Sequence, residues 1–307
     1  DPDGHAYSFH YQRHRLIRRT DPLGYSFYYT YDRYTVGGRC VHTWGDDRVF
    51  DYQLEYQDAP RLTRYTDSLG NTFVSELDDI GYVLAELDPQ GGRTIYAYDK
   101  AGRTIARTDP AGNVQSWEYD ELGNVTKETM PDGAVHQYAY DRTGWLRTYT
   151  DPAGRTWKQR WNTRGLLAER IQPDGGTWRI EYTEKGQPSA RIDPRGHAER
   201  FEYDIHGNLI GRQAATGAYT RYASDLAGTP TKISDAEGAL TRFDYDASDR
   251  LIRRTRPSGA REELAYDAAG NLVRLRDPNG FVTHFEHTAL GDIATRIDPD
   301  GSRVHYQ

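Results

Sequence analysis

The chain has 307 residues, with 39 Lys and Arg against 46 Asp and Glu, so its formal net charge is −7. Only 52 residues are Leu, Ile, Val or Phe, fewer than a domain with a conventional apolar core contains. The chain nevertheless holds 24 Tyr and 6 Trp, which disordered chains avoid. This composition argues against an ordinary α/β enzyme and favours a half-exposed β structure stabilised by aromatic pairs.

Several classes of protein are disfavoured before any motif is considered. No run approaches 18 consecutive apolar residues, and no basic-then-apolar signal segment opens the chain, so we expect no membrane segment. Cys40 is the only cysteine, which excludes an internal disulfide and a cysteine zinc site. Acidic and basic residues are mixed throughout and form no basic patch, so nucleic acid is not an expected partner.

Residues 1–69 carry turn motifs at uneven spacing. In chain order they are Asp1-Pro2-Asp3-Gly4, Asp21-Pro22-Leu23-Gly24 and Tyr31-Asp32, followed by the interruptions Val36-Gly37-Gly38-Arg39 and Thr43-Trp44-Gly45-Asp46-Asp47. We interpret residues 33–66 as variant hairpins with a local irregularity. The sequence thus predicts irregular repeats over 1–69 and regular repeats over 70–307.

From residue 70 onward, glycine recurs with a strict period of 21, the signature of a repeat protein. The twelve positions are Gly70, Gly91, Gly112, Gly133, Gly154, Gly175, Gly196, Gly217, Gly238, Gly259, Gly280 and Gly301. Nine of them are preceded two residues earlier by proline, as in the Asp-Pro-x-Gly motif, in which Asp bonds nearby backbone, Pro presets φ and Gly accepts a positive φ. A second glycine follows eleven residues later in every copy except at Asp249. Each repeat therefore contains two turns.

Between the turns lie two segments of seven to eight residues, the length of a strand. Aromatic residues alternate in the first segment, as in Tyr96/Tyr98 and Trp117/Tyr119, which indicates strand periodicity. An aromatic residue stands seven residues after the first glycine in most copies, often followed by Asp. The residues of this structural repeat are Tyr98, Asp99, Tyr119, Asp120, Tyr140, Asp141, Trp161, Tyr182, Tyr203, Asp204, Tyr245, Asp246, Tyr266 and Asp267. We predict an all-β protein in which each 21-residue repeat forms one antiparallel hairpin beside the next.

Candidate chemistry is sparse, and each candidate has a structural alternative that we prefer. Cys40 and His42 are two apart and would share a strand face, the minimum for a thiolate–imidazole pair, but no third orienting group is identifiable. His284 and His287 are three apart, which places them on opposite faces of a strand, so we expect no shared metal.

The acidic and aromatic candidates likewise have structural alternatives that we prefer. Asp244 and Asp246 share a face, yet Asp246 is the repeat's own Asp, so a turn role is favoured over a catalytic pair. Asp1–Gly4 and Asp298–Gly301 resemble calcium loops without the remaining ligands. The aromatic rows suggest sugar or base stacking, but a binding site should differ from its surroundings, so structural use is favoured. We expect no enzyme activity, cofactor or metal.

Repeated Tyr-Asp, Gly-Asn and Asp-Pro-x-Gly at this spacing resemble the YD (tyrosine–aspartate) repeats of bacterial Rhs proteins, also found in Tc toxins and teneurins. The resemblance covers essentially the whole chain, and the stretch from Tyr31 to Asp46 is similar to the middle of Rhs effectors of Gram-negative bacteria. It implies a long β-sheet that spirals into a hollow β-cocoon shell. That shell encloses the protein's own C-terminal toxin before delivery, typically by a type VI secretion spike.

The resemblance also implies partners and a route: the remainder of the Rhs polypeptide, its toxin, a spike protein and a chaperone, with synthesis in the bacterial cytoplasm before delivery to a target cell. Two departures stand out. Asp88-Pro89-Gln90-Gly91-Gly92 resembles only the beginning of the family's self-cleavage motif and lies in mid-array, and the chain stops at Gln307, before the next expected aromatic. We therefore expect a piece of a longer array with about 28 strands. The alternative is a cell-surface adhesion or carbohydrate-binding module.

Overall fold

The computed structural model describes residues 6–288 and 290–306, which form 29 strands and one short 3-10 helix, η1 (Asp46–Arg48). Every strand pairing that the structure gives is antiparallel, and it joins strands that are consecutive in the chain. The predicted fold class, all-β with antiparallel hairpin repeats, is confirmed.

The strands are short, three to seven residues each. The first fourteen are β1 (Ser8–Gln12), β2 (Arg15–Thr20), β3 (Ser26–Tyr31), β4 (Cys40–Gly45), β5 (Tyr52–Asp58), β6 (Arg61–Thr66), β7 (Thr72–Leu77), β8 (Val83–Leu87), β9 (Arg93–Tyr98), β10 (Thr104–Thr108), β11 (Val114–Tyr119), β12 (Val125–Thr129), β13 (Val135–Tyr140) and β14 (Leu146–Thr150). The others are β15 (Thr156–Trp161), β16 (Leu167–Ile171), β17 (Thr177–Tyr182), β18 (Pro188–Ile192), β19 (Ala198–Tyr203), β20 (Leu209–Gln213), β21 (Tyr219–Ser224), β22 (Pro230–Ser234), β23 (Leu240–Tyr245), β24 (Leu251–Thr255), β25 (Arg261–Tyr266), β26 (Leu272–Arg276), β27 (Val282–His287), β28 (Ile293–Ile297) and β29 (Arg303–His305).

The turns at the two ends of a hairpin are of one kind. At the first turn, Gly112 donates its backbone N–H to the carbonyl of Asp109 (3.0 Å), and Asp109 donates to the carbonyl of Asn113 (3.0 Å). The second turn repeats both bonds between Asp99, Gly102 and Arg103. Because each turn takes five residues, the strands between them have six and five residues, shorter than the segments expected from the sequence.

The hairpins of the regular array also contain a β-bulge beside the second turn. In the β9–β10 pair, Tyr98 lies opposite Thr104, whereas Ala97 lies opposite Ala106, so Ile105 is the extra residue. The same shift recurs in every later pair that the second turn closes and for which a register is given. A bulge bends a strand and increases its twist, so one bend is built into each repeat.

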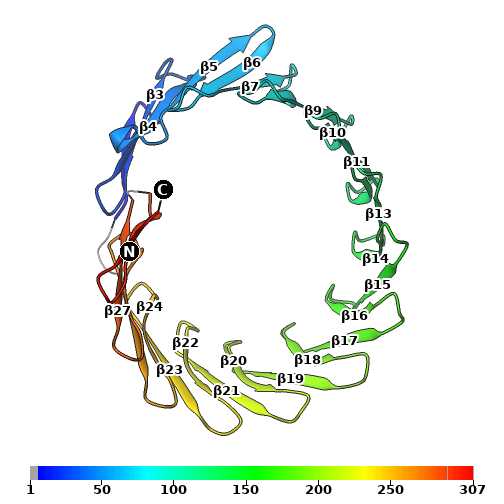
Figure 1. Cartoon of the computed structure of the whole chain (residues 1–307). Coiled ribbons are helices and arrows are strands. Elements are labelled where there is room, and N and C mark those ends of the chain that lie inside the picture. Colours follow the sequence, from blue (N-terminus) through cyan, green and yellow to red (C-terminus); the bar gives the residue numbers. More distant parts are fainter. Residues whose placement is uncertain (1–5, 289, 307) are drawn as a thin grey trace. The chain divides into compact units, whose positions relative to one another are not determined.

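Contacts divide the chain into two units, which we describe separately. One comprises His10–Arg18 and Phe27–Ile180, and the other comprises Asp1–Phe9, Arg19–Ser26 and Glu181–Gln307. Over Phe27–Ile180 of the first unit the strands follow one another in chain order along a curved sheet, blue to green, and over residues 181–306 of the second unit they do so from green to red (Figure 1).

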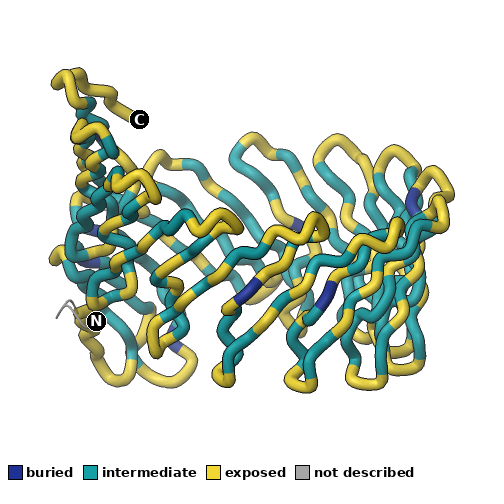
Figure 2. The backbone as a smooth tube through the Cα atoms, turned by 90° about the horizontal axis from the view of Figure 1, so that it is seen from below, coloured by how far each residue is buried: buried dark blue, intermediate teal, exposed yellow. Residues whose placement is uncertain are grey.

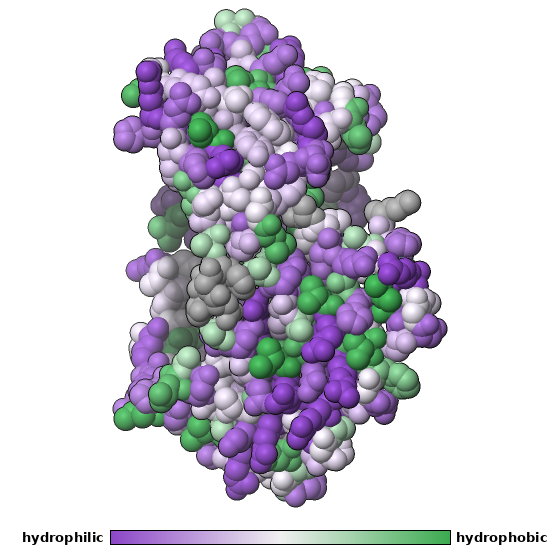
Figure 3. Space-filling view, turned by 90° about the vertical axis from the view of Figure 1, so that its left-hand side faces the viewer, coloured by the Kyte–Doolittle hydropathy of each residue, from purple (hydrophilic) through white to green (hydrophobic). Residues whose placement is uncertain are grey.

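Neither unit has a conventional core. Ala85 and Ala190 are the buried apolar residues among those the structure describes, and no large side chain there is fully buried. Most strand residues are half-buried and most turn tips are exposed (Figure 2). On the face shown in Figure 3, hydrophilic and apolar side chains are interspersed. The scarcity of aliphatic residues is therefore consistent with a single-layer sheet, both faces of which are partly exposed to solvent.

The irregular region near the N-terminus consists of hairpins with unusual connections. The β3–β4 connection contains Gly38, at which a side chain would collide with the backbone carbonyl of Arg33. The β4–β5 connection holds η1 and three non-glycine residues with positive φ, Asp47, Arg48 and Phe50. These two loops coincide with the interruptions expected from the sequence, while the boundary between residues 69 and 70 stays a prediction.

Candidate functional site: the tyrosine–aspartate turn

The Asp of the repeated Tyr–Asp pair caps the second turn of each hairpin. In the turn at Asp120, the Oδ1 atom accepts backbone N–H bonds from Leu122 (3.0 Å) and Asn124 (2.8 Å). The Oδ2 atom accepts a bond from the Asn124 side chain (2.9 Å). Asp favours such turns because its short side chain reaches the backbone two to four residues ahead. The repeated Asp is thus a local device that shapes the chain.

These bonds also favour the charged carboxylate. The Asn124 amide, together with the backbone N–H groups of the turn, lowers the pKa of Asp120. Bonds from the turn also lower the pKa of Asp99, Asp109, Asp141 and Asp204. At Asp151, Asp193, Asp246 and Asp267 burial opposes the charge, but the bonds of the turn outweigh it and lower the pKa. Many turns of the array therefore hold a carboxylate whose charged form is stabilised by the turn itself.

The aromatic residue of the pair ties its strand to the preceding hairpin. The Tyr119 hydroxyl donates to the carbonyl of Thr104 (2.6 Å), which begins β10 beside the bulge. The same bond, always over fifteen residues, joins Tyr98 to Val83 (2.8 Å), Tyr266 to Leu251 (2.9 Å) and the indole N–H of Trp161 to Leu146 (2.8 Å). A bulge disrupts the ladder locally, and the aromatic donor gives the carbonyl beside it a partner.

A third position, four residues after the Asp, links successive second turns. Arg103 bonds its own Asp99 (2.6 Å), donates to the carbonyl of Asp120 in the next repeat (3.0 Å), and lies over the Tyr119 ring (4.7 Å to the centroid). Arg250 repeats all three contacts with Asp246, Asp267 and Tyr266. The sequence does not reveal this link, because the residue at this position changes from copy to copy and its contacts depend on how one turn lies beside the next.

In other repeats an aromatic residue takes the place of the arginine. Tyr82 stacks on Tyr98 (5.0 Å between centroids), and Trp145 packs on Trp161 (5.9 Å). Each of these rings occupies the space that a side chain would need at the second-turn glycine of the next repeat, Gly102 or Gly165. Glycine is therefore required there by packing as well as by its positive φ.

The aromatic rows are less uniform than the sequence suggested. Tyr149 on β14 stacks between Tyr138 on β13 and Trp157 on β15, at 5.3 Å from each, and its hydroxyl meets the Nδ1 atom of His136 (2.8 Å). In neighbouring repeats Arg170 and Glu128 occupy the position of Tyr149. Since the rings of this stack cover one another's faces, the geometry favours strand cohesion over stacking on a sugar or base.

Cys40 and His42 do not form a thiolate–imidazole pair, and both take the structural positions that the sequence analysis favoured. The Cys40 thiol donates to the backbone carbonyl of His42 (3.5 Å), and burial raises the pKa of that thiol. The His42 ring instead bonds Asp51 (2.6 Å) and stacks on Trp44 (4.3 Å). Burial opposes the charge of Asp51, but bonds from His42 and Arg48 outweigh it and lower its pKa. The His42 imidazole therefore has an orienting carboxylate that the sequence did not reveal. The imidazole bonds that carboxylate, whereas the Cys40 thiol bonds the backbone.

The remaining candidates take structural positions. His284 lies opposite Arg274 and His287 lies opposite Ile293 across a bulge. Asp244 pairs with Arg253 (3.6 Å), and Asp246 caps its turn.

The last candidates from the sequence are the two calcium-like loops, and the last expectation concerns membrane segments. At the Asp298–Gly301 turn, Asp298 bonds Arg296 (2.9 Å), while Asp1–Gly4 lies outside the described residues. Over residues 6–288 and 290–306 no group of three or more His, Cys, Asp or Glu side chains is placed to hold a metal ion. The same residues contain no helix with the length and apolarity needed to cross a bilayer.

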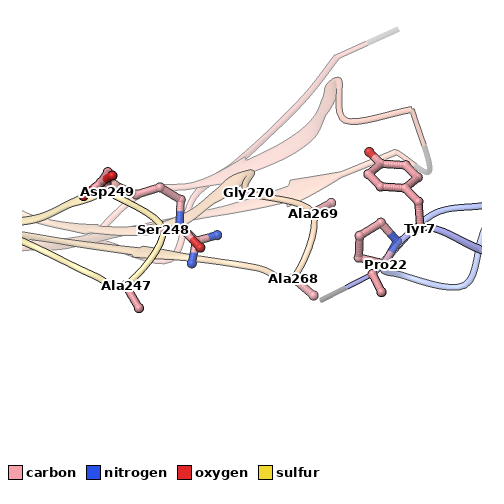
Figure 4. A pocket seen from close by; sticks show the side chains of 10 residues that line it. Tyr7, Pro22, Ala247, Ser248, Asp249, Ala268, Ala269 and Gly270 are labelled. Atoms are coloured by element: carbon pink, nitrogen blue, oxygen red, sulfur yellow. The ribbon is translucent and has the colours of Figure 1, made fainter. Parts of the chain in front are cut away.

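A cavity of about 630 Å³ lies where Tyr7 and Pro22 face two second turns, Ala247–Arg250 and Ala268–Gly270 (Figure 4). Its lining is mostly alanine and turn backbone, and the Arg250 guanidinium is engaged by Asp246. The cavity therefore combines apolar contact surface with the polar residues Ser248, Asp249 and Arg250 of one turn.

Hairpins of constant length, closed by one kind of turn and tied to their neighbours by side chains at fixed spacing, define a β-repeat protein. The RHS Repeat family model matches residues 78–114, 98–135, 140–177, 225–261 and 266–303, which together make up more than half of the chain. The chain therefore belongs to the RHS repeat family, as its motifs predicted.

Solved structures share this fold. The crystal structure of TcdB2-TccC3 aligns with 98% of this chain at a TM-score of 0.78 and 16% identity, and the form without its hypervariable C-terminal region aligns with 97% at 0.77 and 16%. The Tc holotoxin pore of Photorhabdus luminescens aligns with 95% at 0.63 and 14% identity. In each case this chain covers 19% of the solved chain, about a fifth of its length. No curated protein sequence matches significantly.

Proposed function

We propose that this chain is a non-catalytic wall segment of an Rhs-type shell, which encloses a toxin carried by the same polypeptide and holds it until delivery to a target cell. Two findings support this proposal. The chain belongs to the RHS repeat family, and its fold aligns with about a fifth of the length of the TcdB2-TccC3 chain and of the Tc holotoxin pore chain.

The observation that carries the proposal is the uniformity of the repeat. A hairpin that buries little by itself and bonds only to its neighbours extends in one dimension, as in solenoids. One bulge per repeat gives the sheet a regular bend. A curved, extendable layer is what a container wall requires.

The charged side chains on one face of the sheet fit this role. Glu118 pairs with Lys127 across β11 and β12 (2.8 Å), and Glu169 pairs with both Arg160 (3.0 Å) and Arg179 (3.2 Å) across β15 to β17. Exposed ion pairs of this kind contribute little to stability, but they leave a hydrophilic surface without a large apolar area. Such a wall holds cargo by exclusion and weak contacts.

The wider proposal follows the family resemblance. The partners are the rest of the Rhs polypeptide and its C-terminal toxin, with a secretion spike protein and a chaperone. The polypeptide is made in the bacterial cytoplasm and delivered by a type VI spike or on cell contact.

Protection from protease tests the enclosure. The polypeptide that contains this segment, purified intact, is treated with protease with and without a denaturant that opens the sheet. Enclosure predicts that the toxin part survives without denaturant and is digested with it. A toxin part that is digested without denaturant, while the hairpins stay intact, contradicts the proposal.

A further inference from the structure

In the first turn at Asp88, the leading carboxylate lacks the side-chain partner that several other first turns supply. In four first turns, the residue after the glycine bonds the Oδ2 atom of the leading Asp; the pairs are Asn71–Asp67 (2.9 Å), Asn113–Asp109 (2.8 Å), Arg155–Asp151 (2.6 Å) and His197–Asp193 (3.0 Å). In the turn at Asp88, that residue is Gly92, which offers only its backbone N–H, to Oδ1 (2.7 Å). The Asp88 carboxylate occupies the space that a side chain at position 92 would fill.

This turn forms one wall of a small cavity. Its volume is about 190 Å³, and its lining includes Tyr65, Phe73, Glu86, Asp88 and Gly92. Because side chains alternate along a strand, Phe73 on β7 and Glu86 and Asp88 at the end of β8 project from the same face. Tyr65 lies directly opposite Phe73, and their rings stack at 4.6 Å with planes 6° apart. The cavity thus has an aromatic side and an acidic side.

The charges around the cavity are unbalanced. Glu86 accepts a hydrogen bond from the Tyr96 hydroxyl (2.8 Å), which leaves its second oxygen for other donors. None of the lining residues is Lys, Arg or His. Of the nearby cations, Arg93 is engaged by Glu76 (2.6 Å), and Arg107 lies beside Tyr96.

We propose that this cavity binds a guanidinium group, such as the end of an arginine side chain on a partner polypeptide. A planar guanidinium stacks on aromatic surfaces and donates in the plane to carboxylates, whereas an ammonium group is a more strongly hydrated point charge. The cavity supplies both kinds of contact and admits one such group. The inference concerns this cavity and does not depend on the enclosure of a toxin.

The other repeats show that the combination is singular. One repeat further on, Glu86 and Thr94 stand where Tyr65 and Phe73 do, Arg107 replaces Glu86, and Asn113 replaces Gly92. Four repeats on, the aromatic pair and the glycine return as Tyr149, Trp157 and Gly176, but Arg170 and Gln172 replace the two acids. Only the copy at Asp88 combines both acids, both rings and the glycine, and a structural role shared by all repeats would not explain that combination.

The test is a titration of the isotopically labelled 307-residue chain with N-acetyl-arginine amide, followed by the amide resonances of Gln90 and Gly92. N-acetyl-citrulline amide, which has the same shape without the charge, is the matched ligand. Gly92→Asn installs the residue that Asn113 provides in the next repeat, and the flexible Asp88 carboxylate can yield to it. Gly176→Asn is the matched control in a repeat without the acids.

We expect saturable shifts with the arginine ligand and none with the citrulline ligand. Gly92→Asn abolishes the shifts, Glu86→Gln weakens binding by about tenfold, the value of one charge-assisted bond, and Gly176→Asn leaves binding unchanged. Equal binding of the two ligands overturns the proposal, as does undiminished binding to a folded Gly92→Asn variant. Shifts scattered over many repeats, with no preference for residues near Asp88, also overturn it.

Discussion

The Tyr119 hydroxyl and the Thr104 carbonyl, fifteen residues apart in sequence, are joined by a 2.6 Å hydrogen bond across β11 and β10. The next residue, Asp120, caps the turn that follows. The two halves of the Tyr–Asp pair therefore act in different directions: the aromatic residue bonds back to the previous hairpin, and the Asp shapes the next turn. This division explains why the two residue types recur together.

Removing the tyrosine hydroxyl should weaken this link. Tyr119→Phe keeps the ring under Arg103 but leaves the Thr104 carbonyl without its donor, so we expect a loss of about 1 kcal/mol in the free energy of unfolding. Urea denaturation measures it. Tyr11, whose side chain is exposed, provides the control, because Tyr11→Phe should change stability by less than about 0.5 kcal/mol. Equal effects of the two changes would show that the hydroxyl bond contributes nothing.

The effect of a larger truncation should remain local. In an array bonded only between neighbours, Tyr119→Ala should lower hydrogen-exchange protection in β10 to β12 and leave β25 and β26 as protected as before. Hydrogen exchange with peptide-level resolution checks this. A uniform loss of protection over all strands would refute nearest-neighbour stability.

The first-turn glycines allow the cost of the backbone conformation to be measured separately from the cost of a steric collision. Gly112 has a φ of +85°, and a side chain there would meet no atom within 4 Å, so Gly112→Ala should cost about 1–2 kcal/mol from conformation alone. Asp249, the one departure from the second glycine series, has a φ of +58°, and Asp249→Gly should stabilise the chain by up to about 1 kcal/mol. Thermal unfolding of both variants gives the signs, and a stabilising Gly112→Ala would contradict the turn geometry.

The second-turn glycine Gly102 should be less tolerant. A side chain there has the same unfavourable φ and also collides with the Tyr82 hydroxyl, so Gly102→Ala should destabilise more than Gly112→Ala. The double change Gly102→Ala with Tyr82→Leu separates the two causes, because it removes the collision and leaves the φ cost. If the single and double variants unfold at the same temperature, packing of Tyr82 is not the reason for the glycine.

Acidification should destabilise the array as a whole. The pKa values of the turn carboxylates, such as Asp99, Asp109 and Asp120, are lowered in the folded chain by bonds from their own turns. The stabilisation is therefore complete above the unfolded pKa, about 3.9, and is lost as the pH falls through the lower folded values. The unfolding temperature should fall steeply below about pH 4. A temperature that is constant between pH 5 and pH 2 would contradict the capping role.

The aromatic stack at β13 to β15 should contribute more than the equivalent position elsewhere. Tyr149→Leu removes two ring stacks and the bond to His136, so we expect a loss of about 1–3 kcal/mol. Arg170 occupies the same position in the next repeat and is exposed, so Arg170→Leu should change stability by less than about 0.5 kcal/mol. Denaturant unfolding that finds equal effects would mean that the stack is not a special point of cohesion.

Much of the fold is readable from the sequence because every local signal repeats. The period of 21, the paired turn motifs and the alternation of Tyr96 and Tyr98 predict hairpins stacked in chain order. The bulge opposite Tyr98 and the link through Arg103 were not predictable in this way. A bulge depends on pairing register, and the contacts of Arg103 depend on how one turn lies beside the next.

The places where the chain departs from its own repeat were harder to interpret. Sequence spacing paired Cys40 with His42, whereas the fold gives the imidazole to Asp51, which lies beyond the irregular η1 loop. Asp88–Gly92 resembles the beginning of a cleavage motif, yet its physical peculiarity is the missing side chain at Gly92. The missing side chain at Gly92 matters only because Tyr65 and Phe73, which are 27 and 19 residues earlier in the sequence, line the same cavity.

Electron cryo-microscopy of the intact polypeptide that carries this segment would test the enclosing role most directly. The account predicts a continuous wall in which these hairpins bound a hollow, with density for the toxin inside it. Density for a folded toxin outside the wall, or hairpins that bound no hollow, would contradict it.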